Sequence, residues 1–255
     1  MCLILIARNA HPEFPLVVAG NRDEHYRRPT AAAAFWNDHP HVLAGRDLEC
    51  MGTWLGVTRD GRFAALTNFR NPRARKTDAP SRGNLVSGFL ESDTEPRAYL
   101  EKIAPTASRY NGFNLLLGDA NQMLCFSSHT GAVQELQPGI YGLSNHLLDT
   151  PWPKVARGKQ RLRALMARKP SAEALLDMLY DSEPAREEEL PDTGVGAGME
   201  RTLSPALIVS DLYGTRASTA VLFGRDGNVS FTERTILPGG RIGPTVNLRF
   251  SLDRV

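Results

Sequence analysis

The chain has 255 residues, of which 42% are hydrophobic and 23% are charged, and its formal net charge is +2. This composition is typical of a globular protein with a substantial core, and it excludes wholesale disorder. A net charge this small gives no general attraction to nucleic acid or to a membrane surface, so no nucleic-acid partner is expected.

The cysteines and the first residues of the chain indicate the cellular compartment in which we expect the protein. Cys2, Cys50 and Cys125 are widely spaced with no CxxC pair, which argues against a disulfide framework and a zinc site. The first apolar stretch ends at Arg8 and follows no basic segment, so it does not resemble a signal peptide. No stretch approaches the roughly 18 apolar residues of a transmembrane helix. We therefore expect a cytoplasmic protein with no transmembrane segment and no bound metal.

The hydrophobic pattern predicts strands in both halves of the chain, with helices between them. Residues 2–7 are aliphatic throughout and predict a buried first strand. Further strands are expected at 16–20, 54–58, 63–68, 113–117, 123–126, 140–145, 206–209, 218–223 and 229–232. Helices are expected at 83–90, 95–103, from about 152 to 166, and at 172–179 with Ser171 as its cap. Residues 183–200 are acidic and then glycine-rich, and are expected to form a mobile loop.

This order of elements favours antiparallel sheets covered by helices over alternating βαβ units, which gives an α+β fold. No composition shift marks a linker between two cores, so we expect a single domain over residues 1–255.

Cys2 follows the initiator methionine directly. Removal of Met1 would leave a thiol and an α-amine on the same residue. Free thiols titrate near ~8.5 and α-amines near ~7.7–8.0, so the amine can act as the base for its own thiol at neutral pH. The alternative is that Cys2 is a small buried hydrophobic residue, as most free cysteines are.

Four polar residues, Asn21 to Glu24, end the second predicted strand. In a continuous strand the side chains of Arg22 and Asp23 point to opposite faces. Both would face one site only if the strand breaks there, which Gly20 makes easier. The alternative is a polar strand end that carries a surface salt bridge.

A basic, proline-containing loop follows the strand that ends at Asn68. Its charged residues are Arg70, Arg73, Arg75, Lys76 and Arg82. Such a run is usually solvated surface, and the functional alternative is a site for an anionic ligand group. No glycine-rich phosphate cradle accompanies it.

Motifs along nearly the whole chain resemble the NRDE family, the relatives of the transport and Golgi organisation protein. The early motifs are Met1-Cys2, Asn21-Arg22-Asp23-Glu24, Arg28-Pro29-Thr30, Phe35-Trp36, Gly45-Arg46-Asp47 and Gly52-Thr53-Trp54-Leu55-Gly56. The central ones are Leu66-Thr67-Asn68-Phe69-Arg70, Ser81-Arg82-Gly83, Gly112-Phe113-Asn114-Leu115 and Gly142-Leu143-Ser144-Asn145. The set ends with Pro151-Trp152-Pro153-Lys154, Glu200-Arg201-Thr202-Leu203-Ser204 and Tyr213-Gly214-Thr215-Arg216.

The resemblance implies a single NRDE domain that is similar to the N-terminal-nucleophile hydrolases, whose fold is a four-layer αββα sandwich of two antiparallel sheets. The nearest analogy is to the cysteine branch, the bile-salt hydrolases and penicillin V acylases. It implies Cys2 as the nucleophile, Arg22 and Asp23 as its electrostatic and amine-orienting partners, and Asn68 and Asn145 as oxyanion donors. Asn21, Trp54 and Arg70 are expected to contact the substrate.

Two functions follow from the resemblance. The first is cysteine-dependent hydrolysis of an amide or thioester in a small acyl compound, with no cofactor. The second is a non-catalytic carrier or chaperone for haem or an acyl-CoA-type ligand. The carrier is motivated by the basic loop and by the adjacency of Arg22 and Asp23, since the resembling hydrolases space these residues three apart. For haem, the chain has no Cys-Pro pair, and its six histidines are scattered. The sequence does not specify the substrate or the oligomeric state.

Overall fold

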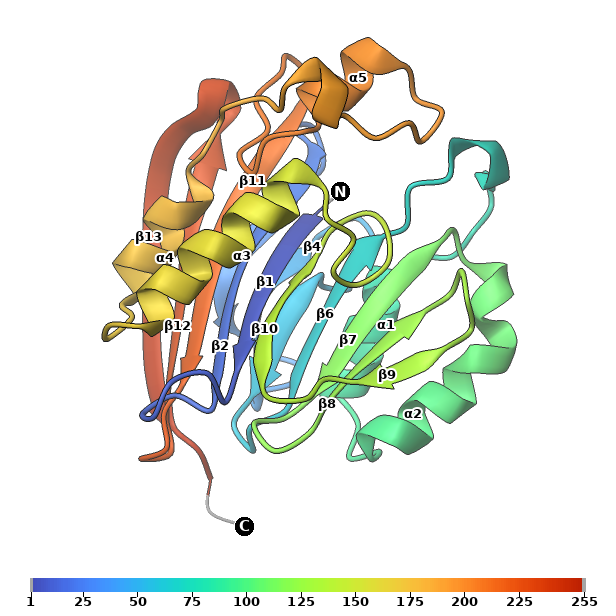
Figure 1. Ribbon diagram of the computed structural model, residues 1–255. Coiled ribbons are helices and arrows are strands. Elements are labelled where there is room, and N and C mark those ends of the chain that lie inside the picture. The colour runs from blue at the N-terminus through green and yellow to red at the C-terminus, as the bar shows by residue number, and fades with distance from the viewer. Residues whose placement is uncertain (1, 254–255) are drawn as a thin grey trace.

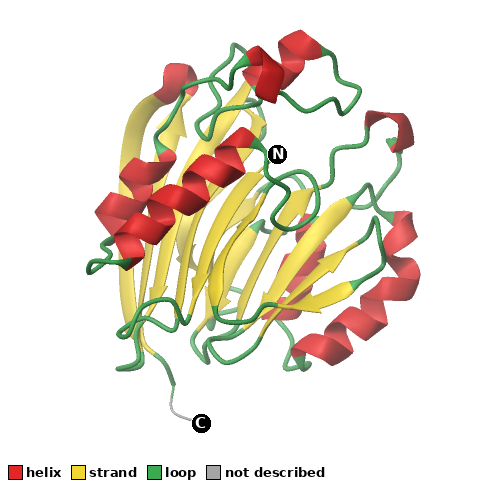
Figure 2. Ribbon diagram, viewed as in Figure 1, coloured by secondary structure: helices red, strands yellow, loops and turns green. Residues whose placement is uncertain are grey.

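The computed structural model describes residues 2–253. Two antiparallel sheets stack face to face, and helices cover the outer face of each sheet (Figures 1 and 2). The expected four-layer αββα sandwich is therefore confirmed. One apolar cluster lies between the sheets, and a further cluster lies under each helical layer.

The first sheet has the strand order β10-β1-β2-β11-β12-β13. Its strands are β1 (Cys2–Arg8), β2 (Leu16–His25), β10 (Gly139–Leu143), β11 (Tyr213–Phe223), β12 (Asn228–Leu237) and β13 (Arg241–Ser251). The second sheet has the order β3-β4-β5-β6-β7-β8-β9. Its strands are β3 (Thr30–Phe35), β4 (Val42–Asp47), β5 (Leu55–Thr58), β6 (Phe63–Asn68), β7 (Phe113–Gly118), β8 (Met123–Ser127) and β9 (Val133–Glu135).

The helices divide between the two outer layers. On the first sheet lie α3 (Pro153–Met166) and α4 (Ala172–Leu179), and on the second lie α1 (Gly83–Leu90) and α2 (Pro96–Ile103), while α5 (Ala197–Thr202) lies at one end (Figure 1). Ser171 caps α4 as expected, its hydroxyl oxygen accepting the backbone N–H of Ala174 at 3.2 Å. Over residues 2–253, no helix is both long enough and apolar enough to cross a membrane.

Strand β1 lies inside the first sheet, paired with β10 on one side and β2 on the other. Its aliphatic residues are buried at every step because both faces of the strand are covered. Leu3 and Leu5 pack toward the helices, whereas Cys2, Ile4 and Ile6 face the second sheet. The expected interior position of the first strand is confirmed, and it places Cys2 at the start of a well-packed strand.

The structure does not break the second strand at the polar quartet. Strand β2 continues to His25, and the irregularity lies on its neighbour β11, where Arg216 is the extra residue between Thr215 and Ala217. Arg22 and Asp23 therefore keep the alternating sides of a regular strand. The break that would turn both toward one face is absent, and the opposite faces expected of a continuous strand are confirmed.

Several strands carry too weak a pattern to be expected. Strands β3, β4, β9 and β13 are absent from the predicted set, and the predicted strand at 206–209 does not form. In that segment the backbone bonds elsewhere: Ile208 N–H donates to the Thr215 hydroxyl at 2.9 Å, and Leu207 N–H to Asp181 O at 2.8 Å. Only Val209 makes an isolated bridge, to Gly214, within the described residues. The expected loop at 183–200 contains a short 3-10 helix, Glu187–Glu189, and the start of α5.

Helix α3 approaches β1 through a glycine. A Cβ added to Gly158 would lie 2.7 Å from Leu5 Cδ1, and Leu5 is fully buried. Overpacking of this kind costs about 1–3 kcal/mol, whereas the gain in helix propensity from glycine to alanine is at most ~1 kcal/mol. Gly158→Ala should therefore lower the free energy of unfolding, measured by chemical denaturation.

Gly198 of α5 is the matched control, because no atom lies within 4 Å of the Cβ that alanine would add. Gly198→Ala should be neutral or stabilise by up to ~1 kcal/mol. Equal stabilisation by both substitutions would contradict the close packing of α3 on β1.

Candidate functional site

Cys2 lies on the wall of a cavity of about 530 Å³ at one end of the sandwich. Its side chain is only 6% exposed, and it stands directly opposite Arg22 in the β1–β2 register. The backbone carbonyl oxygen of Cys2 accepts the Ser144 hydroxyl at 3.1 Å, which ties the strand start to the segment after β10. The strand pairing and this hydrogen bond therefore hold Cys2 in position, and its thiol borders the cavity.

A second, wider cavity of about 840 Å³ continues from the first. Residues on the walls of both include Glu24, Arg28, Asn68, Arg75 and Arg82, so the two volumes form one cleft. We call them the inner cavity, which contains Cys2, and the outer cavity. The outer cavity is bordered by the basic loop and by Tyr213.

Burial governs the protonation of Cys2. Desolvation raises the pKa of its thiol, and this effect outweighs the backbone N–H of Asp23 and the charge of Arg22, which act in the opposite direction. The thiol is accordingly held in its neutral form at pH 7. A nucleophilic role then requires a base that takes the proton during attack.

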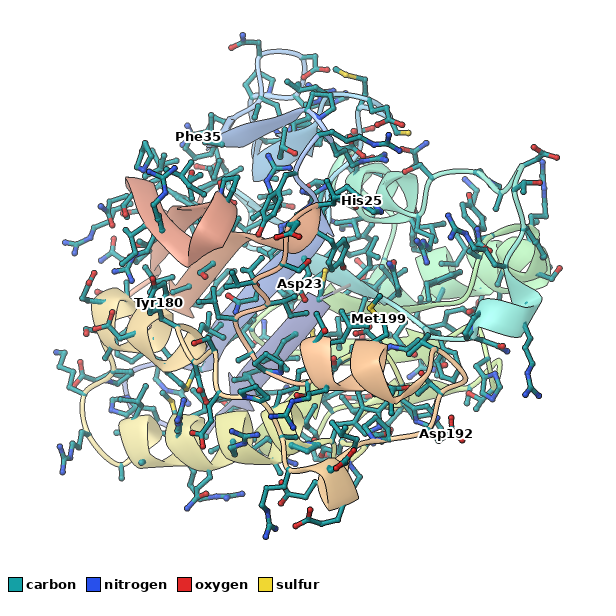
Figure 3. The ribbon with its side chains drawn as sticks, turned by 90° about the horizontal axis from the view of Figure 1, so that it is seen from above. Asp23, His25, Phe35, Tyr180, Asp192 and Met199 are labelled. Atoms are coloured by element: carbon teal, nitrogen blue, oxygen red, sulfur yellow. The ribbon has the colours of Figure 1, made fainter. Side chains whose placement is uncertain are left out.

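Arg22 and Asp23 border Cys2 from different sides. Arg22 and Asp23 both line the inner cavity, and Asp23 is 1% exposed, with its Oδ1 accepting the Thr215 hydroxyl at 2.7 Å. Desolvation raises the pKa of the Asp23 carboxyl. Figure 3, which looks down on the molecule, places Asp23 near the centre of the view.

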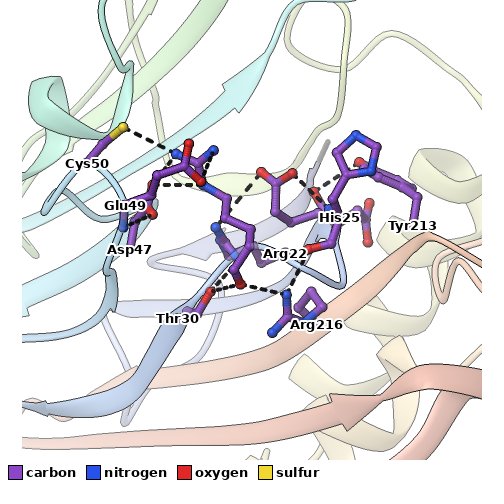
Figure 4. A network of polar contacts seen from close by, with 11 residues as sticks. Arg22, His25, Thr30, Asp47, Glu49, Cys50, Tyr213 and Arg216 are labelled. Carbon is purple, nitrogen blue, oxygen red and sulfur yellow. Dashed lines mark hydrogen bonds and ion pairs between the residues drawn. The ribbon is translucent and has the colours of Figure 1, made fainter.

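A polar network extends from Arg22 across the cleft (Figure 4). Arg22 Nη1 donates to the Thr30 hydroxyl at 3.4 Å, and its Nη2 lies 3.9 Å from Glu24 Oε2. Arg28 donates to Asp47 Oδ2 at 2.7 Å and contacts the Cys50 sulfur at 3.4 Å. These bonds connect β2 with the start of β3, and the loop between β2 and β3 with the end of β4, beside the inner cavity.

The two asparagines expected at the oxyanion lie together. Asn68 lines both cavities, whereas Asn145 is fully buried, and its Nδ2 donates to the backbone oxygen of Asn68 at 3.0 Å. The Asn145 Oδ1 accepts the Ser144 hydroxyl at 3.3 Å. Asn68 is therefore the amide that faces the cavity, and Asn145 supports it from behind.

The three residues expected to contact substrate have different positions. Trp54 lines the inner cavity. Arg70 lines the outer cavity, where its Nη1 donates to Glu200 Oε2 at 2.6 Å and its guanidinium lies 4.8 Å from the Trp152 ring centroid. Asn21 does not reach the cleft, because it points into the helical layer and donates to the backbone oxygen of Ala206 at 2.8 Å. This placement corrects the expectation that Asn21 contacts substrate.

Other buried polar residues around the cleft were not expected. They are Lys154 in the first turn of α3, Glu200 in α5 and Glu233 in β12, together with the half-buried Tyr213 in β11. Tyr213 donates its hydroxyl to the backbone oxygen of Asp23 at 2.9 Å. Lys154, Glu200 and Tyr213 lie in the family motifs, and these motifs were the signal in the sequence that could have identified them. Burial of their charged or polar groups shows only in the fold.

No cluster of three or more histidine, cysteine or acidic side chains within residues 2–253 is arranged to hold a metal ion. His39 lies 3.9 Å from Glu91, and His41 contacts the backbone oxygen of Leu90 at 3.1 Å. His25 and His129 line the outer cavity, so a haem would find an axial ligand there under the carrier alternative.

Solved structures share this architecture. A C2A mutant of the conjugated bile acid hydrolase from Clostridium perfringens superposes with a TM-score of 0.53 at 9% identity, covering 97% of this chain and 92% of that one. A second variant of the same hydrolase gives a TM-score of 0.52 at 10% identity, covering 98% of both chains. The fold is that of an N-terminal-nucleophile hydrolase.

The chain belongs to the Transport and Golgi organisation 2 family, whose model matches residues 1–238. The cow protein named Transport and Golgi organization protein 2 homolog is 38% identical over 93% of this chain and 94% of its own length. The human homologue is 36% identical with the same coverage, and the Drosophila melanogaster protein is 28% identical over 92% of each chain.

Removing one partner of the Arg70–Glu200 pair should cost stability, because both side chains are buried and the remaining charge would be left uncompensated. Arg70→Met would leave the Glu200 carboxylate without its arginine, and breaking a buried pair in this way costs ~3–5 kcal/mol. Adding Glu200→Gln should recover part of this loss. Chemical denaturation of the wild type, both single variants and the double variant measures the coupling.

Arg186 and Glu189 form an exposed pair at 2.8 Å and provide the control. Arg186→Met should change the free energy of unfolding by no more than ~1 kcal/mol. A loss from Arg70→Met as small as this would show that the buried pair does not anchor α5.

Proposed function

We propose that the protein is a cysteine-dependent N-terminal-nucleophile hydrolase that cleaves an amide or thioester bond in a small acyl compound. The observation that carries the proposal is the position of the Cys2 thiol, which borders a cavity with Arg22 opposite it and Asn68 on the wall. The inner cavity, of about 530 Å³, is within the range typical of small-molecule sites.

The reaction starts from a chain whose Met1 has been removed, so that Cys2 carries the α-amine. Because burial holds the thiol neutral, the α-amine takes the thiol proton as Sγ attacks the substrate carbonyl carbon. Asp23, on the helical side of the strand start, orients the resulting ammonium. Arg22 stabilises negative charge on the sulfur from the cavity side.

The attack places negative charge on the carbonyl oxygen. The side-chain amide of Asn68 donates to this oxygen, and Asn145 holds Asn68 in place through its bond to the Asn68 backbone oxygen. The carbon–nitrogen or carbon–sulfur bond then breaks, and the ammonium returns its proton to the departing amine or thiol. A water molecule, deprotonated by the same α-amine, hydrolyses the acyl–cysteine thioester and regenerates the free thiol.

The comparisons support this proposal. The conjugated bile acid hydrolase of the same fold is named a hydrolase, and one of its solved forms replaces a cysteine at its second residue by alanine.

Cys2→Ala should abolish hydrolysis while leaving the fold intact, because it removes the group that forms the acyl intermediate. Asn68→Ala should slow the reaction by about 10²–10³, the usual effect of losing one oxyanion donor. Cys125→Ala, which removes a thiol buried away from the cleft, should leave turnover unchanged. A panel of acyl-amides and thioesters provides the substrates, and product release is the readout.

Turnover by Cys2→Ala equal to that of the wild type would contradict the nucleophile assignment. The carrier alternative makes a different prediction from the basic side chains at the outer cavity, Arg75, Lys76 and Arg82. It predicts no turnover by any variant, unimpaired binding of an acyl-CoA or haem by Cys2→Ala, and weaker binding after charge reversal at Arg75 or Lys76.

A further inference from the structure

Glu233 is a buried acidic residue that the proposed reaction does not use. It lies on β12, is 5% exposed and lines the inner cavity. Its Oε1 accepts the backbone N–H of Ala33 at 2.7 Å, and its Oε2 accepts the Thr219 hydroxyl at the long distance of 3.5 Å. An ionised carboxylate has about four acceptor positions, so Glu233 keeps acceptor capacity at the cavity wall.

Glu233 lacks a cationic partner among the described residues. Its hydrogen-bond partners are a backbone amide and a hydroxyl, and within residues 2–253 it takes part in no ion pair. Arg22 lies two strands away, and its Nη2 is 3.9 Å from Glu24 Oε2. The buried Glu200, by contrast, pairs with Arg70 at 2.6 Å. Desolvation raises the pKa of the Glu233 carboxyl, and a cationic ligand group would offset this cost of burial.

The sheet register places Glu233 on the same face as the nucleophile. Glu233 stands opposite Thr219 on β11, and Thr219 stands opposite Gly20 on β2. Gly20 in turn pairs with Ile4, which faces the second sheet as Cys2 does. Strand β12 lies three strands from β1 (Figure 1), which separates the two residues by roughly 14 Å across the sheet. The inner cavity thus extends between the sheets from the thiol to the carboxylate.

The second sheet leaves room beside this carboxylate. Gly45 of β4 lies on the opposite wall, and a Cβ added to it would lie only 3.2 Å from Glu233 Oε2. The neighbouring wall residues of β3, Ala31 and Ala32, are also small. A ligand group that enters the inner cavity can therefore approach Glu233 without displacing a large side chain.

The two cavities divide a substrate at its reacting carbonyl group. The leaving group departs while the acyl group is still bonded to the Cys2 sulfur, so it needs an exit that the acyl group does not block. The outer cavity supplies this exit, since Asn68 lies on the walls of both cavities. The acyl group accordingly occupies the inner cavity, whose wall includes Glu233.

We propose that Glu233 determines the substrate class by binding a primary ammonium group at the far end of the acyl chain. The substrate is then an amide or thioester of an amino-substituted acyl compound. This inference rests on the proposed function, because it concerns the acyl group that Cys2 accepts. An ammonium supplies both the missing positive charge and N–H donors, and hydrogen bonds between ionised groups are stronger than those between neutral ones.

The test is a binding measurement that does not depend on turnover. Cys2→Ala is titrated by calorimetry with linear acyl amides that end in a primary amine, and with the same amides ending in a methyl group, over a series of chain lengths. The amine should bind more tightly than the methyl group by about tenfold or more. This preference should peak at one intermediate length, because the register fixes the position of Glu233. Equal binding of both sets at every length would overturn the inference.

Glu233→Gln separates recognition from a structural role. Glutamine keeps the shape of the side chain and an oxygen that accepts the Ala33 N–H, but it removes the charge. Added to Cys2→Ala, it should abolish the amine preference and leave the binding of methyl-ended amides unchanged. An amine preference that survives Glu233→Gln would overturn the inference.

Glu173→Gln is the matched control. Glu173 contacts Arg234, which follows Glu233 on β12 and points to the other face of the strand, and it does not line the inner cavity. Its substitution should keep the amine preference. Loss of the preference in this control would show that the net charge of the protein, and not Glu233, is responsible.

Turnover by the protein with its native Cys2 separates this inference from the proposed function. An amine preference in binding, without cleavage of any amine-ended amide or thioester, would support the role of Glu233 and count against the hydrolase. Cleavage that Cys2→Ala abolishes, with no preference for the amine, would support the nucleophile and refute the role of Glu233.

Discussion

The site depends on the pairing of β1 between β10 and β2. The two ladders hold the first strand in register, so that Cys2 stands opposite Arg22 and its backbone is bonded to Ser144. A chain terminus is ordinarily poorly ordered unless it is tied into a sheet. Here β1 is paired with a neighbouring strand on each side, and this pairing positions Cys2.

The same burial sets the electrostatics of the site. Moving a charge out of water costs several kcal/mol unless an opposite charge or good hydrogen bonds compensate it. Asp23 and Lys154 are both buried, and Arg70 is paired with Glu200 at 2.6 Å. These charged residues come from β2, α3, α5 and the loop after β6, so they are brought together only in the folded chain.

The sequence predicted most of the fold, because its buried strands and amphipathic helices have clear periods. Helix α1 lies at the expected residues, and alternation along β2 correctly separated Arg22 from Asp23. The missed strands have weak patterns: β3 is rich in alanine, and β13 is an edge strand that contains Pro244 and is mostly exposed. Propensity alone does not identify such strands, because their place is set by the neighbour with which they pair.

The site was harder to predict than the fold. A motif does not say which face of a sheet a residue occupies, and for that reason Asn21 was assigned to the cleft although it bonds to the helical layer. Arg70 and Glu200 are 130 residues apart, and no local pattern connects them. The burial of Lys154, whose Nζ donates to the backbone oxygen of Leu203, likewise shows only in the fold.

The central claim is that Cys2 acts as an N-terminal nucleophile. Intact-mass measurement of the purified protein, before and after a quenched incubation with an acyl donor that it turns over, tests this claim most directly. The account predicts a chain that lacks Met1 and gains the mass of one acyl group, located on Cys2 by peptide mapping. A chain that retains Met1, or an acyl group found on another residue, would contradict it.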